Sequence, residues 1–191
     1  MRWQSALALA FAALVACAGL LAVSAFVLHG FSARDEPSAV EAFVAHRLRH
    51  LAVPLAARQV ENPIAPSEAV LAEARGHFAD HCALCHGNDG RGDTPIGRNL
   101  YPKAPDLRAP GTQSLSDGEL FYIIENGVRF TGMPAWGASE SHGDEASWQL
   151  VHFIRHLPEL TPAELAEMAE LNPRPRHGHH EHRSAAPHHR H

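Results

Sequence analysis

The most conspicuous pattern along the chain is an apolar run close to its start. Residues 6–28 include no charged side chain, and Ser24 is the only polar residue among them. A helix of these 23 residues is long enough to cross a hydrocarbon core of about 30 Å. We therefore expect residues 1–30 to form an N-terminal membrane anchor, with a removable signal as the alternative.

After this run, apolar residues recur at the spacing of helices. A stripe made of Val40, Phe43, Val44, Leu48 and Leu51 predicts a helix over about 37–53. This helix is either a plain stalk, or it lies on the membrane surface or packs on the folded domain or on a partner. Further periodic stretches, most of them opened by a capping residue, predict four more helices. The first of these helices begins at Ser67, and the other three cover 116–126, 145–157 and 161–171. Every predicted element is a helix, so the expected fold class is all-α.

Proline-rich stretches mark the boundaries between segments. Pro54 and the sequence Asn-Pro-Ile-Ala-Pro at 62–66 predict a linker. The chain then divides into an anchor or signal at 1–30, a helix and linker at 31–66, a folded domain at 67–171, and a tail at 172–191. Within the domain, residues 87–113 are rich in glycine and proline and predict a long loop. A loop of this length in a compact domain usually wraps something functional.

The clearest candidate for a cofactor-binding site is the sequence Cys82-Ala83-Leu84-Cys85-His86. This C-x-x-C-H string is the attachment motif of c-type haem, because two thiols three residues apart can each form a thioether to the porphyrin while the next residue offers an imidazole to the iron. Zinc would require a second pair of ligands at similar spacing, and the one other cysteine is Cys17, in the apolar run. A redox C-x-x-C usually opens a helix after a strand, and no strand pattern precedes this one.

A second iron ligand is expected downstream, at Met133. The chain has two other methionines, the initiator Met1 and Met168, and the latter lies in a charged terminal helix. Met133 stands between Gly132 and Pro134, so it is expected on a rigid loop. Histidine and methionine together raise the haem potential and leave no open iron position for a substrate.

Together these residues resemble class I c-type cytochromes, and most of all the small bacterial monohaem group related to the cytochrome c subunits of cbb3-type oxidases. The resemblance covers about Ser67 to Leu157. It is carried by Gly76, Phe78, the haem motif with Gly87, Asp89-Gly90-Arg91-Gly92, Pro102 to Leu107, Leu115 to Leu120, Ile124 to Gly127, Gly132-Met133-Pro134, Trp148 and Phe153.

The resemblance implies a cytochrome c-like helical domain with one covalent haem c. Cys82 and Cys85 would form the thioethers, and His86 and Met133 would be the axial ligands of the iron. It further implies that a proline carbonyl such as that of Pro95 accepts a bond from His86.

Two further features follow from the same resemblance. The last helix of the domain would cross the first near Gly76 and Phe78, where glycine would permit close approach. Candidates for contact with the haem propionates are Arg98, Tyr101 and Trp136.

The N-terminal segment admits three interpretations. It is an uncleaved anchor, a signal cut after Val23-Ser24-Ala25, or a lipoprotein leader in which Cys17 is lipidated. The positive Arg2 favours an N-terminus inside the cell. Bacterial c-type cytochromes acquire haem outside the cytoplasmic membrane, so the resemblance adds that residues after about 30 lie in the periplasm. We expect a single-pass protein of the cell inner membrane.

Charge and histidine content bear on the partners. Residues 65–171 carry 16 Asp and Glu against 7 Lys and Arg, which disfavours nucleic acid. The excess either steers the domain toward a basic partner or serves solubility alone. The tail holds seven of the sixteen histidines and is expected to be disordered and able to bind copper, nickel or zinc. The pairs His77/His81 and His152/His156 stand four residues apart on predicted helices, a spacing that can bind metal or face solvent.

The leading hypothesis is a membrane-tethered electron carrier rather than an enzyme, either free or as a subunit of a larger oxidoreductase. A quinol-oxidising complex, a periplasmic dehydrogenase or a terminal oxidase would be its redox partner. One alternative is a haem enzyme or a sensor of gas or peroxide, formed if Met133 leaves the iron. The other is a copper- or nickel-handling protein that uses the tail.

Overall fold

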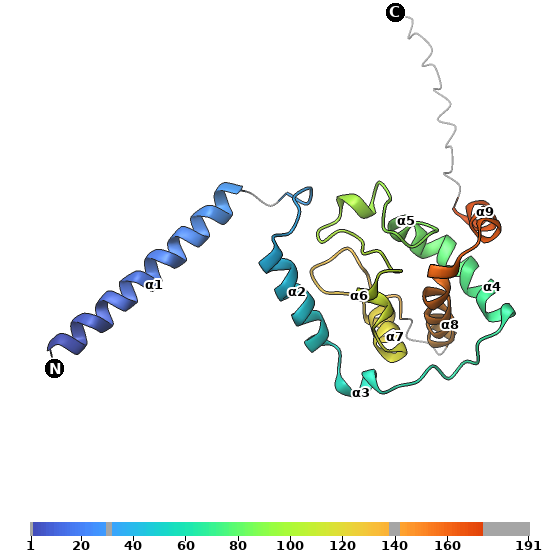
Figure 1. The fold of residues 1–191 in the computed structure, drawn as a ribbon, viewed down its shortest axis with the longest axis horizontal. Helices are drawn as coiled ribbons and strands as arrows, with labels where there is room; N and C mark the ends of the chain where they lie inside the picture. The colour runs from blue at the N-terminus through green and yellow to red at the C-terminus, as the bar shows by residue number, and fades with distance from the viewer. Residues whose placement is uncertain (1, 30–31, 138–141, 174–191) are drawn as a thin grey trace, which may run out of the picture.

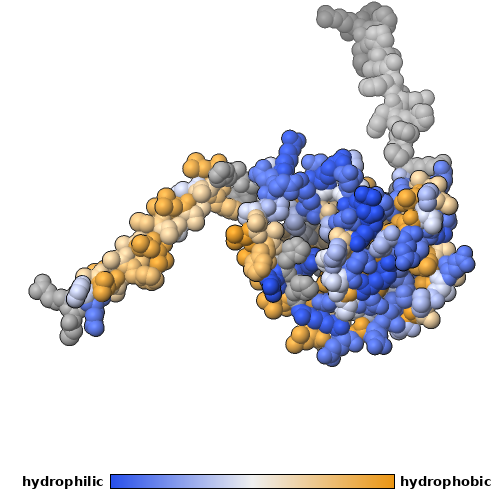
Figure 2. Space-filling model, in the orientation of Figure 1, coloured by the Kyte–Doolittle hydropathy of each residue, from blue (hydrophilic) through white to orange (hydrophobic). Residues whose placement is uncertain are grey.

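Helices form all the regular structure in residues 2–29, 32–137 and 142–173, which are the residues that the computed structural model describes (Figure 1). The all-α expectation is confirmed for this part of the chain. Helix α1 (Arg2–His29) contains the apolar span Trp3–Leu28, none of which is buried in the fold. Its length and composition suit a membrane span, and a signal sequence meets the same description. Figure 2 shows apolar side chains along α1 and again over part of the globular body.

Helix α2 (Ala39–Ala52) begins two residues later than the sequence predicts. Ser38 is its N-cap, and the Ser38 hydroxyl accepts a hydrogen bond from the Glu41 backbone N–H at 3.2 Å. Pro37 therefore precedes the helix and does not occupy its first turn. The apolar stripe of α2 is exposed to solvent, and Val40 and Leu51 are among its exposed members. A different face of α2 lines the interior cavity described below.

The segment 53–66, expected to be a plain linker, packs on the domain. It includes a short helix, α3 (Leu55–Arg58), beside helix α7 (Asp117–Asn126). The contact requires glycine at position 118, because a Cβ there would lie 1.9 Å from the Ala57 carbonyl oxygen. Farther along, the Asn62 side-chain amide donates to the Trp148 carbonyl at 2.9 Å. These contacts were not predicted, because they join residues far apart in the sequence.

The core forms where α4 (Glu68–His77) crosses α8 (His142–His156). Ser67 caps α4, as expected, and accepts a bond from the Val70 N–H at 3.2 Å. Ala74 and Phe78 are fully buried, and the Phe78 ring lies 5.1 Å from the Phe153 ring. The expected crossing is present, but Gly76 does not provide the close approach. A Cβ on Gly76 would meet no atom within 4 Å, so the small residue at the contact is Ala74.

The chain from α4 to the haem motif continues without a break. A single π-helical turn, η1 (Phe78–Cys82), follows α4 and leads into α5 (Ala83–His86). Turns of this type insert one residue into a helix and are frequent at functional sites. Gly87 ends α5 with a φ of 74°, a backbone conformation that favours glycine. The insertion and the glycine stop together set how the motif faces the interior.

The remaining elements enclose the other sides of the interior. The predicted loop 87–113 contains two short helices, η2 (Gly97–Asn99) and α6 (Pro110–Gln113). Helix α7 has the predicted capping box, formed by Ser116 and Glu119, and ends at Gly127. Arg155 of α8 holds the start of α7, because it bonds Asp117 at 2.8 Å and the Leu115 carbonyl at 2.5 Å.

The last described helix, α9 (Pro162–Leu171), follows the short turn η3 (Leu157–Glu159) and also opens with the predicted capping box. Its Met168 is fully buried in the core. Glu164 and Glu167 pair with Arg75 of α4 at 3.2 and 2.8 Å. The tail histidines lie outside the described residues: His177, His179, His180, His182, His188, His189 and His191.

Candidate functional site

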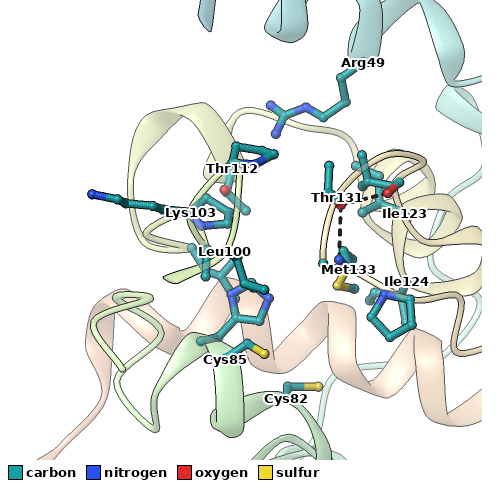
Figure 3. Close-up of a pocket in the computed structure, with 18 of the residues that line it drawn as sticks. Arg49, Cys82, Cys85, Leu100, Lys103, Thr112, Ile123, Ile124, Thr131 and Met133 are labelled. Carbon is teal, nitrogen blue, oxygen red and sulfur yellow. Dashed lines mark hydrogen bonds between the residues drawn. The ribbon is translucent and has the colours of Figure 1, made fainter. Parts of the chain in front are cut away.

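A cavity of about 350 Å³ lies between α2, α5, α7, α8 and the loops around residues 100–107 and 128–136. Cys82, Cys85, His86 and Met133 all line it. The structure therefore brings the four predicted site residues together, although Met133 is far from the other three in sequence. Most of the remaining lining is apolar, with Leu120 and Ile124 from α7 and Ile154 from α8 as examples. Figure 3 shows Cys82 and Cys85 at one side of this space.

Both cysteines of the motif are free thiols in this structure. Burial raises the pKa of Cys82 to about 12, and the neighbouring Cys85 adds to the shift. The Cys82 sulfur is thus a neutral thiol at pH 7 and not the low-pKa thiolate typical of a redox C-x-x-C. Among the described residues no three His, Cys, Asp or Glu side chains come together as a metal-binding group. The thiols are placed to react with a group inside the cavity.

His86 lies on the last turn of α5 and is half-buried. Its Nδ1 atom has no hydrogen-bond partner among the described residues. Burial lowers the pKa of His86, while the nearby Pro105 carbonyl acts in the opposite direction. The imidazole is therefore neutral at pH 7, which is the form that ligates metals. An unpartnered buried nitrogen is costly unless a ligand or a polar neighbour completes its bonding.

The proline beside His86 is Pro105 and not Pro95, which the resemblance suggested. The Pro95 carbonyl instead accepts a hydrogen bond from the Asn99 side-chain amide at 2.7 Å. Pro105 lines the cavity, whereas Pro95 lies on the exposed loop before η2. The wrong choice arose because several prolines follow the motif, and only the folded loop shows which one returns to the histidine.

Met133 is held by a loop that folds back on the end of α7. The Met133 N–H donates to the Thr131 hydroxyl at 3.1 Å, and the Met133 carbonyl accepts from the Val128 N–H at 3.1 Å. The Trp136 N–H continues the attachment with a bond to the Ile124 carbonyl at 3.0 Å. Figure 3 shows the Met133 side chain within the cavity and the bond to Thr131. The backbone thus fixes the loop and leaves the thioether free to serve as a ligand.

The donor set fits haem c. Two thiols stand at the spacing required for thioethers, an imidazole follows them, and a thioether reaches the same apolar space. Nitrogen and thioether sulfur are an established pair of haem iron ligands. An apolar lining suits the flat porphyrin and excludes water from the iron.

The residues suggested for the propionates divide into two groups. Tyr101 and Trp136 line the cavity. Arg98 does not line it, since this exposed side chain pairs with Asp93 at 2.5 Å. The Tyr101 hydroxyl donates to Glu41 of α2.

The sequence allowed the 37–53 helix to pack on the domain but did not identify the face by which α2 reaches this cavity. Glu41, Ala42, Ala45 and Arg49 line it from one helix face. The signal was present, because two alanines and an arginine at spacings of three and four form a face with small side chains beside the apolar stripe. The prediction instead singled out the stripe of larger apolar residues, which is the exposed face of α2.

The two histidine pairs have other contacts in the fold. The His152 ring bonds the Ile64 carbonyl at 2.7 Å, and the His156 ring bonds Glu164 at 2.9 Å. The rings of His77 and His81 meet edge to face at 4.8 Å. His152 and His156 therefore each bind a separate polar partner instead of facing solvent as a pair.

One of three comparisons with known proteins matches a cytochrome family. The model of the family "Cytochrome C oxidase, cbb3-type, subunit III" matches residues 69–154. No curated protein matches the chain. Among solved structures, a chain of the reducing HAO-like protein complex of Kuenenia stuttgartiensis is 24% identical with a TM-score of 0.44. The match covers 51% of this chain and 49% of that one, so the chain spans about half the length of this relative.

Proposed function

We propose that this chain, a c-type cytochrome by its residues 69–154, carries a single haem c with histidine and methionine ligation and works as a membrane-anchored electron carrier. A cytochrome c domain of this family implies covalent haem c and a role in electron transfer with redox protein partners. The number of haems, the two axial ligands and the cellular location are the new parts of the proposal.

In the proposed site, Cys82 and Cys85 would hold the cofactor through two thioethers, and His86 and Met133 would hold the iron. When bound, haem c supplies an iron centre that takes up and releases one electron at a time. The apolar side chains of α7 and α8 keep water from this centre. Met133 would supply a second protein ligand to the iron, which disfavours the reaction of small ligands there. The chain thereby favours electron transfer over substrate chemistry.

The observation that carries the proposal is the convergence of the motif and Met133 on one apolar cavity. The Met133 loop is fixed by hydrogen bonds from the backbone N–H groups of Val128, Met133 and Trp136, the second of them to the Thr131 hydroxyl. A second observation supports it, since the Pro105 carbonyl lies beside the His86 imidazole, as the hydrogen-bond partner of a ligating histidine does. We propose one haem because the sequence contains one C-x-x-C-H motif.

The test uses full-length protein made in a host that matures c-type cytochromes. We expect a mass increase of one haem and the weak far-red absorbance band of methionine bound to ferric haem. Met133→Leu should abolish this band, lower the midpoint potential and permit binding of carbon monoxide. Met168→Leu is the matched control, because Met168 is buried in the core away from the cavity. Persistence of the band in Met133→Leu would refute the ligand assignment.

The same purified protein bears on the sensor alternative. Ready binding of carbon monoxide by the wild type, without a far-red band, would indicate an open iron position. Such a result would favour the gas or peroxide sensor over the carrier.

We propose in addition that α1 is a single membrane span and that the haem domain lies in the periplasm. The apolar character of α1 supports its role as a membrane anchor. The attachment of haem outside the cytoplasmic membrane supports a periplasmic location of the haem domain. The expected partners are a quinol-oxidising complex, a periplasmic dehydrogenase or a terminal oxidase. Cell fractionation should leave the haem protein in membranes after an alkaline carbonate wash, with its N-terminal residues retained in the mass. Release of a shortened protein would indicate a cleaved signal instead.

A further inference from the structure

We infer, on the basis of the proposed haem site, that α2 covers the propionate edge of the haem and that its Arg49 is the counter-ion of a propionate. This helix precedes the segment that matches the cytochrome family, which begins at residue 69. The inference therefore assigns a cofactor-binding role to a part of the chain outside the matched domain.

The first argument comes from the chemistry of the porphyrin. The two vinyl-derived carbons that form thioethers and the two propionates lie on opposite halves of the macrocycle. Cys82 and Cys85 stand at one side of the cavity, and Figure 3 shows Arg49 entering from the other side. A haem joined to the two sulfurs must therefore extend its carboxylates toward the side from which Arg49 enters.

The second argument concerns Arg49 itself. Its Nε atom is buried and has no hydrogen-bond partner in the part of the chain that the structure describes. Burial lowers the pKa of Arg49, and the carboxylate of Glu119 offsets this only in part. Arginine keeps its charge in proteins, so a half-buried guanidinium beside an apolar space requires an anionic partner. A propionate has the planar, two-oxygen geometry that the guanidinium fork binds best.

The third argument excludes the other cation at this cavity. Lys103 also lines the space, but its ammonium pairs with Glu36, before the start of α2. The Tyr101 hydroxyl pairs in the same region with Glu41 of α2. These two contacts tie the N-terminal part of α2 to the loop 100–105 and use the polar groups of both partners. Arg49, two turns farther along α2, is left facing the interior (Figure 3).

The cavity face of α2 includes small side chains, as close packing against a cofactor requires. Ala42 and Ala45 are its small residues, so the helix backbone can approach the cofactor closely. Larger residues such as Phe43 and Leu48 lie on the exposed side. A helix that only served as a spacer from the membrane would have no need of small residues and a buried cation on the face toward the cofactor.

The experiment compares Arg49→Gln and Arg47→Gln in the haem-loaded, full-length protein. Arg47 is the matched control, because it lies on the exposed side of α2 over the Phe43 ring, 5.2 Å from the ring centroid. Arg49→Gln should lower the midpoint potential, since a positive charge near the haem favours the reduced state. It should also raise hydrogen exchange of the α2 backbone amides by about tenfold or more, as loss of a charge-assisted bond predicts. Arg49→Lys should restore much of the potential.

Two outcomes would overturn the inference. One is a potential and an exchange rate that are the same in Arg49→Gln and Arg47→Gln. The other is faster exchange with an unchanged potential, which would give Arg49 a purely structural role. Arg49→Met, which keeps the apolar stem, serves for both measurements if Arg49→Gln does not accumulate. The haem mass and the far-red band should persist in every variant, and their absence from the wild type would instead refute the proposed haem site.

Discussion

Gly92 illustrates how single residues shape the site. Its φ is +73°, and a Cβ at this position would lie 2.3 Å from the Ala104 carbonyl oxygen. The Gly92 N–H donates to the His86 carbonyl at 2.7 Å, so the glycine joins the motif to the loop that returns with Pro105. Neither the conformation nor the space permits a side chain.

We predict that Gly92→Ala destabilises the haem-loaded protein by about 1–3 kcal/mol or more, because it combines backbone strain with a clash. Thermal and urea unfolding followed by haem absorbance would measure this. Gly76→Ala is the matched control, since its Cβ would meet open space within a helix. That variant should gain about 0.5–1 kcal/mol from helix propensity. Equal effects of the two substitutions would contradict the structure.

The residues of the candidate site differ in how far the sequence could predict them. Cys82, Cys85 and His86 are adjacent and form a motif with its own chemistry, so they could be named without a structure. Met133 could be named because the domain contains few methionines, and the fold places it in the same cavity. Arg49 could not, because only the docking of α2 turns its side chain inward. The role of each ligand remains a prediction until the haem is bound.

At the scale of elements, α9 depends on one carboxylate. The Thr161 backbone N–H donates to Glu164 at 2.8 Å and lowers the pKa of Glu164 to about 2, with smaller contributions from the Thr161 hydroxyl and His156. The folded state therefore favours the ionised form. This contribution to stability is fully present above the unfolded pKa of about 4.5 and is lost as the pH falls toward 2.

We predict that Glu164→Gln destabilises the protein at pH 6 and that the difference from wild type shrinks as the pH approaches 3. Melting temperatures between pH 3 and pH 7 would show this convergence. Glu159→Gln, at an exposed position in η3, is the control and should follow the wild type. A Glu164→Gln deficit that stays constant with pH would mean that the carboxylate charge has no part in capping α9.

Helices that carry local signals were predicted well. The caps at Ser67, Ser116 and Thr161 are all present, because a capping side chain and the N–H it binds are three residues apart. The packing of α3 and of the cavity face of α2 was missed. Those features depend on tertiary contacts, such as the approach of Ala57 to Gly118, that no local pattern encodes.

At the scale of the whole molecule, charge is the dominant surface property. Residues 65–171 carry an excess of nine negative charges over positive ones. Such a domain repels anions and attracts cations over distances comparable to the Debye length, and salt weakens both effects.

We predict opposite salt dependence for two small oxidants of the reduced protein. The rate with ferricyanide should rise with ionic strength, and the rate with the cationic tris(phenanthroline)cobalt(III) should fall. Stopped-flow traces from about 10 mM to about 500 mM salt would measure both, over the range in which screening changes most. Parallel slopes would mean that the acidic excess lies away from the haem edge.

Lys103 is the only lysine of the chain, and its ammonium meets Glu36 at the point where the polypeptide enters α2. A zero-length coupling of amine to carboxylate therefore has one lysine side chain to act on, and it would link the segment before α2 covalently to the loop that contains Lys103. An unchanged rate of electron transfer in the cross-linked protein would show that electrons pass while α2 stays in place. Loss of electron transfer in the cross-linked protein would show that partners reach the haem only when α2 moves away from it.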